Sequence, residues 1–418
     1  MTESPAEPLD DEEGGPQNEP VQPTPLLRPA DGLPPVVADR AALVRTAAEF
    51  AAGSGPVAVD AERASGFRYS QRAYLVQLRR SGAGTALVDP IPLGSDLSEL
   101  APALTGPEWV LHAANQDLAC LAEVGLAPSA LFDTELAGRL AGLPRVGLGP
   151  MVEQLLGLGL EKGHGAADWS RRPLPEDWLV YAALDVEVLV ELRDVLAALL
   201  TEQGKYEWAM QEFEAVRTAG PAAPRAEPWR RTSGIHKLRK PRALAAVRSL
   251  WEARDRLAAE RDIAPGRVLP DAAIVDAAVT APETAHALAG MAVFRGRSQR
   301  RLTNYWFAAL QEAAALDADA LPRPSAPADG PPPVARWADR DPDAAARLAA
   351  ARAALAATGE QWSVPVENLL QPDLLRRLCW TPPADGDVGA AMRKGGARDW
   401  QVALLGEQLE AALATRAT

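Results

Sequence analysis

The stretch PVAVDAE, residues 56–62, decides the fold of the first half of the chain, because an apolar strand ends there in two acidic residues. Pro56–Asp60 is rich in Val and is bounded by Gly and Pro, which is typical of a buried strand. Side chains two positions apart share one face of a strand, so Asp60 and Glu62 are expected to point the same way. Similar apolar segments predict further strands at Tyr74–Leu78, Thr85–Asp89 and Trp109–His112.

Helical segments surround these strands. Three strands in sequence, followed by a strand among helices, predict an α/β fold with a mixed sheet flanked by helices. The predicted helices are Ala41–Ala52, Asp96–Leu104, Gln116–Val124, Thr134–Leu140, Leu148–Leu156 and one long helix at about Pro175–Glu202.

The whole chain has the composition of a globular protein with two or three domains. It has 418 residues, of which 47% are hydrophobic and 24% are charged, and both fractions are ordinary. No run of 18 apolar residues occurs and the N-terminus is acidic, so neither a membrane span nor a secretory signal is expected. Cys120 and Cys379 are predicted to be inert thiols in a reducing compartment. We therefore expect a cytoplasmic protein with no membrane partner.

Charge is distributed unevenly along the chain. The net charge is −13, but residues 1–27 contain seven acidic residues, no basic residue and six prolines. This composition predicts a disordered acidic tail over residues 1–35. Residues 225–306 contain sixteen Lys or Arg and eight Asp or Glu, a net charge of +8. The average therefore hides a basic module.

Two proline-rich segments divide the chain. Thr218–Pro228 and Leu321–Val334 read as linkers, and the segments between and after them read as helical. The sequence VLPDAAIVDAA at 268–278 is loosely echoed by LLQPDLLRRLCW at 369–380, which predicts a duplicated helical module. The predicted domains are 36–215 (α/β), 229–316 (helical) and 341–418 (helical), with 317–340 as a linker.

Three further chemically interesting residues lie downstream of Asp60 and Glu62. Asp117 in LHAANQDLACL opens a helix, where an Asp is commonly only a helix cap. Tyr181 and Asp185 are four residues apart on one helix face, which alone would indicate a surface contact. Together, however, four convergent carboxylates repel one another unless a cation lies among them. A pair of Mg²⁺ ions and phosphodiester hydrolysis fit this pattern.

The order of these motifs resembles the DEDD superfamily of 3′→5′ exonucleases, in its tyrosine-bearing branch, and within that branch the ribonuclease D family. The matching stretches are AYLVQL at 73–78, HAANQDL at 112–118 and KGHGAADWSRRPLPEDWLVYAALDV at 162–186. The resemblance covers roughly residues 36–205 and continues through about 229–310, which resembles an HRDC domain. It is weaker over 341–418. This chain has Ala61 where the family often has Thr. The stretch after Glu62 also lacks an aromatic-rich sequence that is common in the family.

The resemblance implies an RNase H-like 3′→5′ exonuclease fold followed by all-α HRDC-like domains. It also implies two divalent cations, Mg²⁺ or Mn²⁺, held by the four carboxylates. Asp60 would contact both ions, Glu62 and Asp185 would hold the ion that carries the attacking water, and Asp117 would support the other. Tyr181 would orient the water.

Basic residues are candidates for substrate contacts, mainly to phosphates. Lys162 and Arg172 could contact phosphates near the site, whereas His164 is not expected to act as the base because Tyr181 fills that position. Two clusters in the basic module extend the set, although Arg-rich helices can be simply solvated faces. The candidates in this module are Trp229, Arg230, Arg231, Lys237, Arg239, Lys240, Arg297 and Arg300.

The favoured function is a metal-dependent 3′→5′ exoribonuclease that releases nucleoside 5′-monophosphates. If the family's role carries over, it trims the 3′ ends of tRNA precursors and other structured RNA. Two alternatives remain open: a 3′→5′ DNA exonuclease in repair, and a nuclease fold that binds RNA without catalysis.

Overall fold

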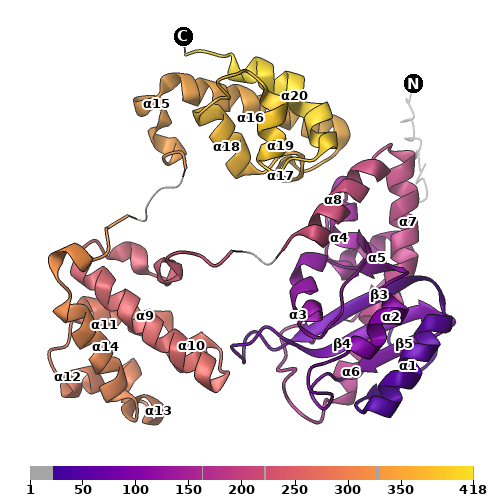
Figure 1. Cartoon of the computed structure of the whole chain (residues 1–418), viewed down its shortest axis with the longest axis horizontal. Helices are drawn as coiled ribbons and strands as arrows, with labels where there is room; N and C mark the ends of the chain where they lie inside the picture. Colours follow the sequence, from indigo (N-terminus) through magenta and orange to yellow (C-terminus); the bar gives the residue numbers. More distant parts are fainter. Residues whose placement is uncertain (1–21, 162, 221–222, 326–329, 418) are drawn as a thin grey trace, which may run out of the picture.

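The computed structural model describes residues 22–161, 163–220, 223–325 and 330–417. These residues form an α/β lobe followed by two helical lobes (Figure 1). The predicted fold class, a mixed sheet flanked by helices and followed by all-α domains, is confirmed. No helix in the described part of the chain has the length and apolar character needed to cross a bilayer.

The α/β lobe is built on a six-stranded sheet with the order β2-β5-β4-β3-β6-β7. Strand β4 is antiparallel to both of its neighbours, β3 and β5, while β2 runs parallel to β5, and β6 and β7 run parallel to β3. The strands are β2 (Val36–Val37), β3 (Ser54–Arg63), β4 (Ala73–Ser81), β5 (Gly84–Val88), β6 (Glu108–Leu111) and β7 (Ala130–Asp133).

Strand β3 lies in the middle of the sheet, and its centre, Val57–Val59, is fully buried. Its pairing with β6 sets Val57 opposite Trp109 in parallel register. Parallel strands end at the same edge of a sheet, so the chain leaving β6 emerges beside the acidic end of β3.

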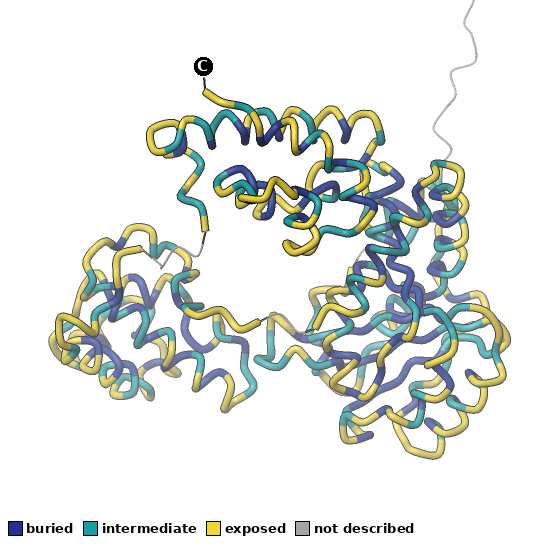
Figure 2. The backbone as a smooth tube through the Cα atoms, turned by 45° about the horizontal axis from the view of Figure 1, so that its top comes forward, coloured by how far each residue is buried: buried dark blue, intermediate teal, exposed yellow. Residues whose placement is uncertain are grey.

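Helices cover both faces of this sheet (Figure 1). Helix α6 packs against β3, β4 and β5, and α7 packs against β3 and β6. The helices and 3₁₀ turns of the lobe are α1 (Arg40–Ala52), η1 (Ser98–Leu100), α2 (Ala101–Leu104), η2 (Ala114–Gln116), α3 (Leu118–Glu123), α4 (Thr134–Leu140), α5 (Leu148–Leu156), α6 (Glu176–Glu187), α7 (Leu189–Glu202) and α8 (Tyr206–Thr218). In Figure 2 buried segments run through the sheet and also along the helices of all three lobes.

The predicted helix at 175–202 is two helices, α6 and α7, which meet at Val188. No Gly or Pro marks this junction, so the apolar periodicity reads as continuous. Strand β7 and helix α8 were not predicted. Strand β7 is only four residues long, so it carries little periodicity.

The predicted tail of residues 1–35 is only partly within the described residues. Residues 1–21 lie outside them, whereas β1 (Thr24–Leu26) pairs in parallel with β8 (Leu158–Leu160). The prediction of disorder is therefore wrong for residues 24–26. The short β8 supplies backbone partners for β1, which composition alone could not reveal.

The second lobe, residues 228–320, has its own apolar core around Trp229, Leu250, Phe294 and Trp306. Its elements are η3 (Pro228–Arg231), η4 (Ile235–Lys237), α9 (Pro241–Arg261), α10 (Pro265–Val268), α11 (Asp271–Thr280), α12 (Ala285–Gly290), η5 (Val293–Arg295), α13 (Arg297–Arg300), α14 (Thr303–Ala315) and η6 (Ala318–Ala320).

The third lobe repeats part of this arrangement. A 21-residue helix ends in a left-handed residue, Asp262 in one lobe and Ser363 in the other, and a four-residue helix and a Pro-Asp helix follow. The same order of elements therefore occurs in both helical lobes. The elements are η7 (Val334–Arg336), α15 (Trp337–Arg340), α16 (Pro342–Trp362), α17 (Val366–Leu369), α18 (Pro372–Trp380), α19 (Val388–Lys394) and α20 (Asp399–Leu413).

The two helical lobes contact the α/β lobe differently. The third lobe packs on α8, where Trp208 stacks on Trp400 and the buried Glu212 accepts hydrogen bonds from Trp400 Nε1 and Arg398. The second lobe contacts residues 64–72, hereafter the β3–β4 loop, through polar groups. Arg267 donates to the Gly66 carbonyl at 2.8 Å, and Asp262 accepts from the Ser70 amide at 2.8 Å.

Candidate active site

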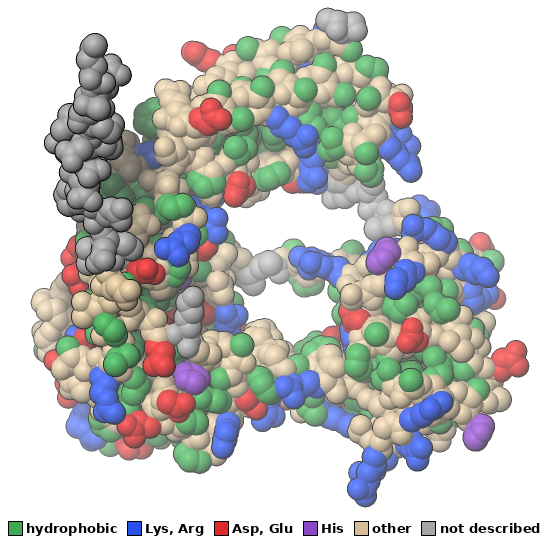
Figure 3. Space-filling view, turned by 180° about the vertical axis from the view of Figure 1, so that it is seen from behind, with side chains coloured by type: hydrophobic (Ala, Val, Ile, Leu, Met, Phe, Trp, Pro, Cys, Tyr) green, Lys and Arg blue, Asp and Glu red, His purple; other side chains and the backbone are tan. Residues whose placement is uncertain are grey.

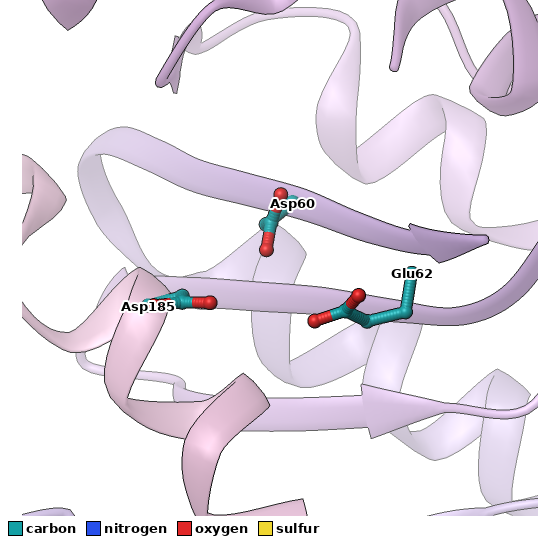
Figure 4. Close-up of side chains that lie close together, drawn as sticks. All are labelled: Asp60, Glu62 and Asp185. Atoms are coloured by element: carbon teal, nitrogen blue, oxygen red, sulfur yellow. The ribbon is translucent and has the colours of Figure 1, made fainter. Parts of the chain in front are cut away.

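Three carboxylates converge at the C-terminal end of the central strand β3. One oxygen from each of Asp60, Glu62 and Asp185 lies within 4.8 Å of the others. Asp60 and Glu62 share one face of β3, and Asp185 extends from α6 toward them (Figure 4). We call these three residues the carboxylate trio. The alternation of side chains along β3 explains why the D-x-E spacing aims both acids at one point.

Burial gives the trio an unusual electrostatic state. Burial raises the pKa of Asp60 to about 6, while a backbone hydrogen bond from Ala61 and the charge of Arg63 oppose the shift. Burial, followed by the charges of Asp60 and Asp185, raises the pKa of Glu62 to about 10. The pKa of Asp185 is also raised, by burial and then by Asp60. Without a cation, the three groups cannot all be ionised near neutral pH.

Asp117 lies beside the trio but is not part of it. It occupies the N-cap position of α3, yet its side chain makes no capping hydrogen bond. It is buried, and an Arg63 guanidinium nitrogen lies 3.4 Å from its Oδ1. Burial and the charge of Asp60 raise its pKa to about 8, although Arg63 opposes the shift. The helix-cap role is therefore excluded for Asp117.

A buried aspartate that was not predicted fixes the turn before Asp117. Asp133, at the end of β7, accepts hydrogen bonds from the amides of Ala113 and Ala114 at 3.1 and 2.9 Å, and it also caps α4 through Glu135 and Leu136. Ala113 has a φ of 58°, a left-handed conformation that is costly for alanine. The two hydrogen bonds from Ala113 and Ala114 to Asp133 stabilise this turn. In the sequence, Asp133 directly precedes the predicted helix Thr134–Leu140, and no local pattern connects it to Asp117.

Tyr181 borders the trio from α6, one turn before Asp185. Its hydroxyl is hydrogen-bonded to Asp185, and burial followed by the nearby carboxylates raises its pKa well above the usual value. The phenol is therefore protonated at neutral pH and can donate or orient, but it is a poor base. The ring of His164 lies edge-on to it at 5.7 Å.

Neither nearby histidine replaces Tyr181. His164 Nε2 lies 3.6 Å from Asp177, and the imidazole ring packs against the rings of Trp178 and Tyr181. His112, at the end of β6, shares its Nδ1 with the Thr134 hydroxyl at 2.9 Å. Burial lowers the pKa of His112 to about 4, so it is neutral at physiological pH.

The trio opens into a cavity of about 460 Å³ that is also lined by Arg63, Asp117, Gly165 and Tyr181. Two smaller cavities adjoin it. One, of about 350 Å³, extends past Tyr181 and His164, and the other, of about 280 Å³, extends past Arg63 along Gly165–Ala167. Cavities therefore lie on both the Tyr181 side and the Arg63 side of the carboxylates.

The donor set fits divalent cations. The trio supplies only carboxylate oxygens, the hard ligands that Mg²⁺ and Mn²⁺ prefer. Among the described residues, the only ion pair that reaches any of the four carboxylates is that of Arg63 with Asp117. A cluster with this much buried acid and one cation is short of positive charge, which bound divalent ions would supply.

The two basic residues expected near the site differ in what the structure shows. Lys162 lies outside the described residues. Arg172 donates to both oxygens of the buried Asp89, at 2.6 and 2.8 Å, and to the Tyr74 carbonyl at 2.8 Å. Its guanidinium therefore fastens the loop before α6 to β4 and β5, and the expectation that it binds substrate is not supported.

The predicted contacts of the basic module also separate into two groups. Trp229 is 3% exposed and packs in the core, and Arg230 is paired with Glu227, so neither presents a free surface. The exposed candidates are Arg231, Lys237, Arg239, Lys240, Arg297 and Arg300.

Lys237, Arg239 and Lys240 lie on the rim of a cavity of about 690 Å³, which we call the basic groove. Its floor is apolar and includes Ala246 and Phe307. Figure 3 shows Lys and Arg side chains around a hydrophobic surface patch on this lobe, at the lower right.

Comparison with family models identifies three regions. A 3′-5′ exonuclease model matches residues 35–201, and an HRDC domain model matches residues 243–310. Residues 330–413 match a model described as a 3′ to 5′ exonuclease C-terminal domain. The last match falls on the lobe that was predicted to be a divergent HRDC-like domain.

Known proteins show the same similarity over most of the chain. Ribonuclease D of Gluconacetobacter diazotrophicus is 32% identical over 79% of this chain and 82% of its own length. Ribonuclease D of Nitrobacter hamburgensis is 30% identical over 87% and 93%. A crystal structure of a protein from Bifidobacterium adolescentis matches with a TM-score of 0.88 and 39% identity over 94% of this chain and all of its own. Escherichia coli RNase D shares the fold, with a TM-score of 0.65 and 24% identity over 91% and 98%.

Proposed function

The chain belongs to the ribonuclease D family of 3′→5′ exoribonucleases, and we propose that the carboxylate trio is the site at which it hydrolyses RNA. The observation that carries the proposal is the approach of three buried carboxylates to within 4.8 Å of one another. Burying like charges is costly unless they hold a cation, so the geometry favours a metal site over a structural role.

We assign Asp60, Glu62 and Asp185 as ligands of divalent cations, and Asp117 as a fourth ligand. Magnesium is the proposed ion, and manganese is expected to replace it. When bound, the ions stabilise the negative charge that develops on the phosphate oxygens and on the departing 3′ oxygen. Water adds to the phosphorus of the last phosphodiester bond, the bond to the 3′ oxygen breaks, and a nucleoside 5′-monophosphate is released.

Tyr181 is proposed to orient the attacking water. Its hydroxyl is hydrogen-bonded to Asp185 and stays protonated because its pKa is raised. A fixed hydroxyl beside the ligands can hold a water in line with the phosphorus, which is worth a large rate factor even without proton transfer.

We further propose tRNA precursors and other structured RNA as substrates and the cytoplasm as their location. The net positive charge of the second lobe and the exposed cations of the basic groove support binding through phosphates. Recognition of this kind carries no sequence preference. The buried thiols Cys120 and Cys379, which are both free, fit a reducing compartment.

The test is hydrolysis of 3′-labelled RNA in Mg²⁺ by the wild type and by Asp60→Asn. The wild type is expected to release mononucleotides stepwise, and the substitution is expected to lower kcat at least about 10³-fold because it weakens metal binding at the centre of the site. Asp96→Asn, which changes an exposed acid of the same lobe, is the matched control. Equal activity of wild type and Asp60→Asn would refute the site assignment.

The same assay separates the alternatives. RNA ending in a ribose should be degraded faster than the same strand ending in a deoxyribose, and the opposite preference would favour a DNA exonuclease. A tRNA precursor with a 3′ trailer should be shortened to a defined end. RNA binding without release of mononucleotides would indicate a binding protein.

A further inference from the structure

The side chain of Arg63 does not follow the alternation that is expected along a β-strand. Arg63 is the last residue of β3 and directly follows Glu62, so a regular strand would turn its side chain to the opposite face. However, the pairing of β3 with β4 shifts register between Glu62 and Arg63. Such irregularities redirect side chains at sheet edges. The Arg63 guanidinium consequently reaches Asp117, 3.4 Å away.

This ion pair coincides with an asymmetry in the site. Asp60, Glu62 and Asp185 can share one ion, whereas Asp117 is not among the residues whose oxygens meet within 4.8 Å. The acid that is outside the trio is the one that already has a cation beside it. The Asp117 side chain is 8% exposed and that of Arg63 is 26% exposed, so water screens the pair only weakly.

We propose that Arg63 is a positioning residue that competes with a divalent cation for Asp117, so that the two cations of the site bind in order and with unequal affinity. This inference rests on the metal site proposed above. The trio then takes its cation first. Binding on the Asp117 side is opposed while the guanidinium stays, because its positive charge repels an incoming cation and occupies the Asp117 carboxylate.

The cavity beside Arg63 offers the guanidinium another place. Arg63 lines both the main cavity and the adjoining one along Ser65, Gly66 and Gly165–Ala167. A phosphate of an entering nucleic-acid strand is an anion that a guanidinium binds through two parallel hydrogen bonds. Substrate therefore favours release of Asp117, and the second cation binds tightly only when RNA is present.

The test is a titration of the full-length protein with Mn²⁺, with free Mn²⁺ followed by electron paramagnetic resonance. The wild type is expected to bind one ion at least about tenfold more tightly than the second. Arg63→Met removes the charge and keeps the volume, so it should tighten the second site about tenfold and leave the first within about twofold. Arg63→Lys keeps a cation and should behave like the wild type.

A short RNA with a non-hydrolysable phosphorothioate at its 3′ end provides a second readout. It should tighten the second Mn²⁺ site of the wild type but change that of Arg63→Met only slightly. Arg68→Met is the matched control because Arg68 lies in the β3–β4 loop and donates to Ser170, 2.8 Å away, instead of to the carboxylates. Arg63→Gln repeats the test in a polar variant if Arg63→Met is poorly folded.

The outcomes distinguish this inference from the metal site on which it rests. If Arg63→Met and Arg63→Gln leave the second site unchanged or weaken it, Arg63 does not compete with a cation. If Asp60→Asn still binds the first Mn²⁺ with full affinity, the trio is not the metal site and both proposals fail.

Discussion

The acidic site and the basic groove hold opposite charges in opposite ways. Asp60, Glu62 and Asp185 are crowded together, and burial raises all three pKa values, to which the charges of neighbouring carboxylates add at Glu62 and Asp185. Lys237, Arg239 and Lys240 are exposed on a groove rim and are solvated individually. A crowded buried cluster acts as a unit, so one substitution should change it greatly. Exposed charges contribute separately, so their effects should be small, additive and sensitive to salt.

After loss of a metal ligand, the substitution Tyr181→Phe should have the largest effect on activity. Removing the hydroxyl leaves the carboxylates in place but frees the water that it orients, so kcat should fall about 100-fold. Affinity for Mn²⁺, measured by titration, should stay within about twofold. Tyr305→Phe is the control, because that hydroxyl is bonded to the Ala253 carbonyl in the second lobe. An unchanged kcat for Tyr181→Phe would leave the water without an orienting group on α6.

The sequence predicted the acidic site better than the basic groove for a physical reason. Asp60 and Glu62 are two apart on a strand, and Tyr181 and Asp185 are four apart on a helix, so local geometry alone aims each pair. Their convergence then requires only that the strand and the helix pack together, which the α/β pattern predicts.

Contacts that depend on long-range packing were not predictable in this way. Arg172 looked like a free loop cation, but Asp89 comes from a strand 83 residues earlier in the chain. Trp229 and Arg230 looked like a binding surface, but Trp229 is buried and Glu227 holds Arg230. Arg63 reaches Asp117 only through a register shift between β3 and β4, which no periodicity in the sequence reveals.

The basic groove should show the second-largest effect. Replacing Lys237, Arg239 and Lys240 together by Gln should raise KM for a tRNA precursor about tenfold at physiological salt and leave kcat unchanged. The slope of log affinity against log salt should become shallower by about 1 to 2, since each lost phosphate contact retains counterions. Filter binding across a salt series measures both quantities.

The matched control removes the same charge from another surface. Arg336, Arg340 and Arg352 are exposed on the third lobe, and their joint replacement by Gln should change the salt slope by less than half as much. Equal effects of the two triple substitutions would mean that net charge, and not the groove, attracts RNA.

The smallest effect concerns stability and has opposite signs at the two regions. In EDTA at pH 8, Asp60→Asn should raise the free energy of unfolding by about 1 kcal/mol, because it removes one charge from a repelling cluster. The shift should be seen as about 2–4 °C in the melting of the first lobe. Substitutions of groove cations should leave the melting temperature unchanged or lower it slightly.

The pH dependence provides the critical control for this last prediction. The folded-state pKa of Asp60 is about 6 against an ordinary value of 3.8, so the folded protein holds this proton more tightly than the unfolded chain does. In the metal-free wild type, the contribution of Asp60 to folding stability is therefore largest below about pH 4. This contribution is lost as the pH rises through about 6. The advantage of Asp60→Asn should accordingly be smaller at pH 5 than at pH 8, and Mn²⁺ should reverse it at pH 8. An advantage that does not depend on pH would mean that Asp60 does not carry the repulsion of the cluster.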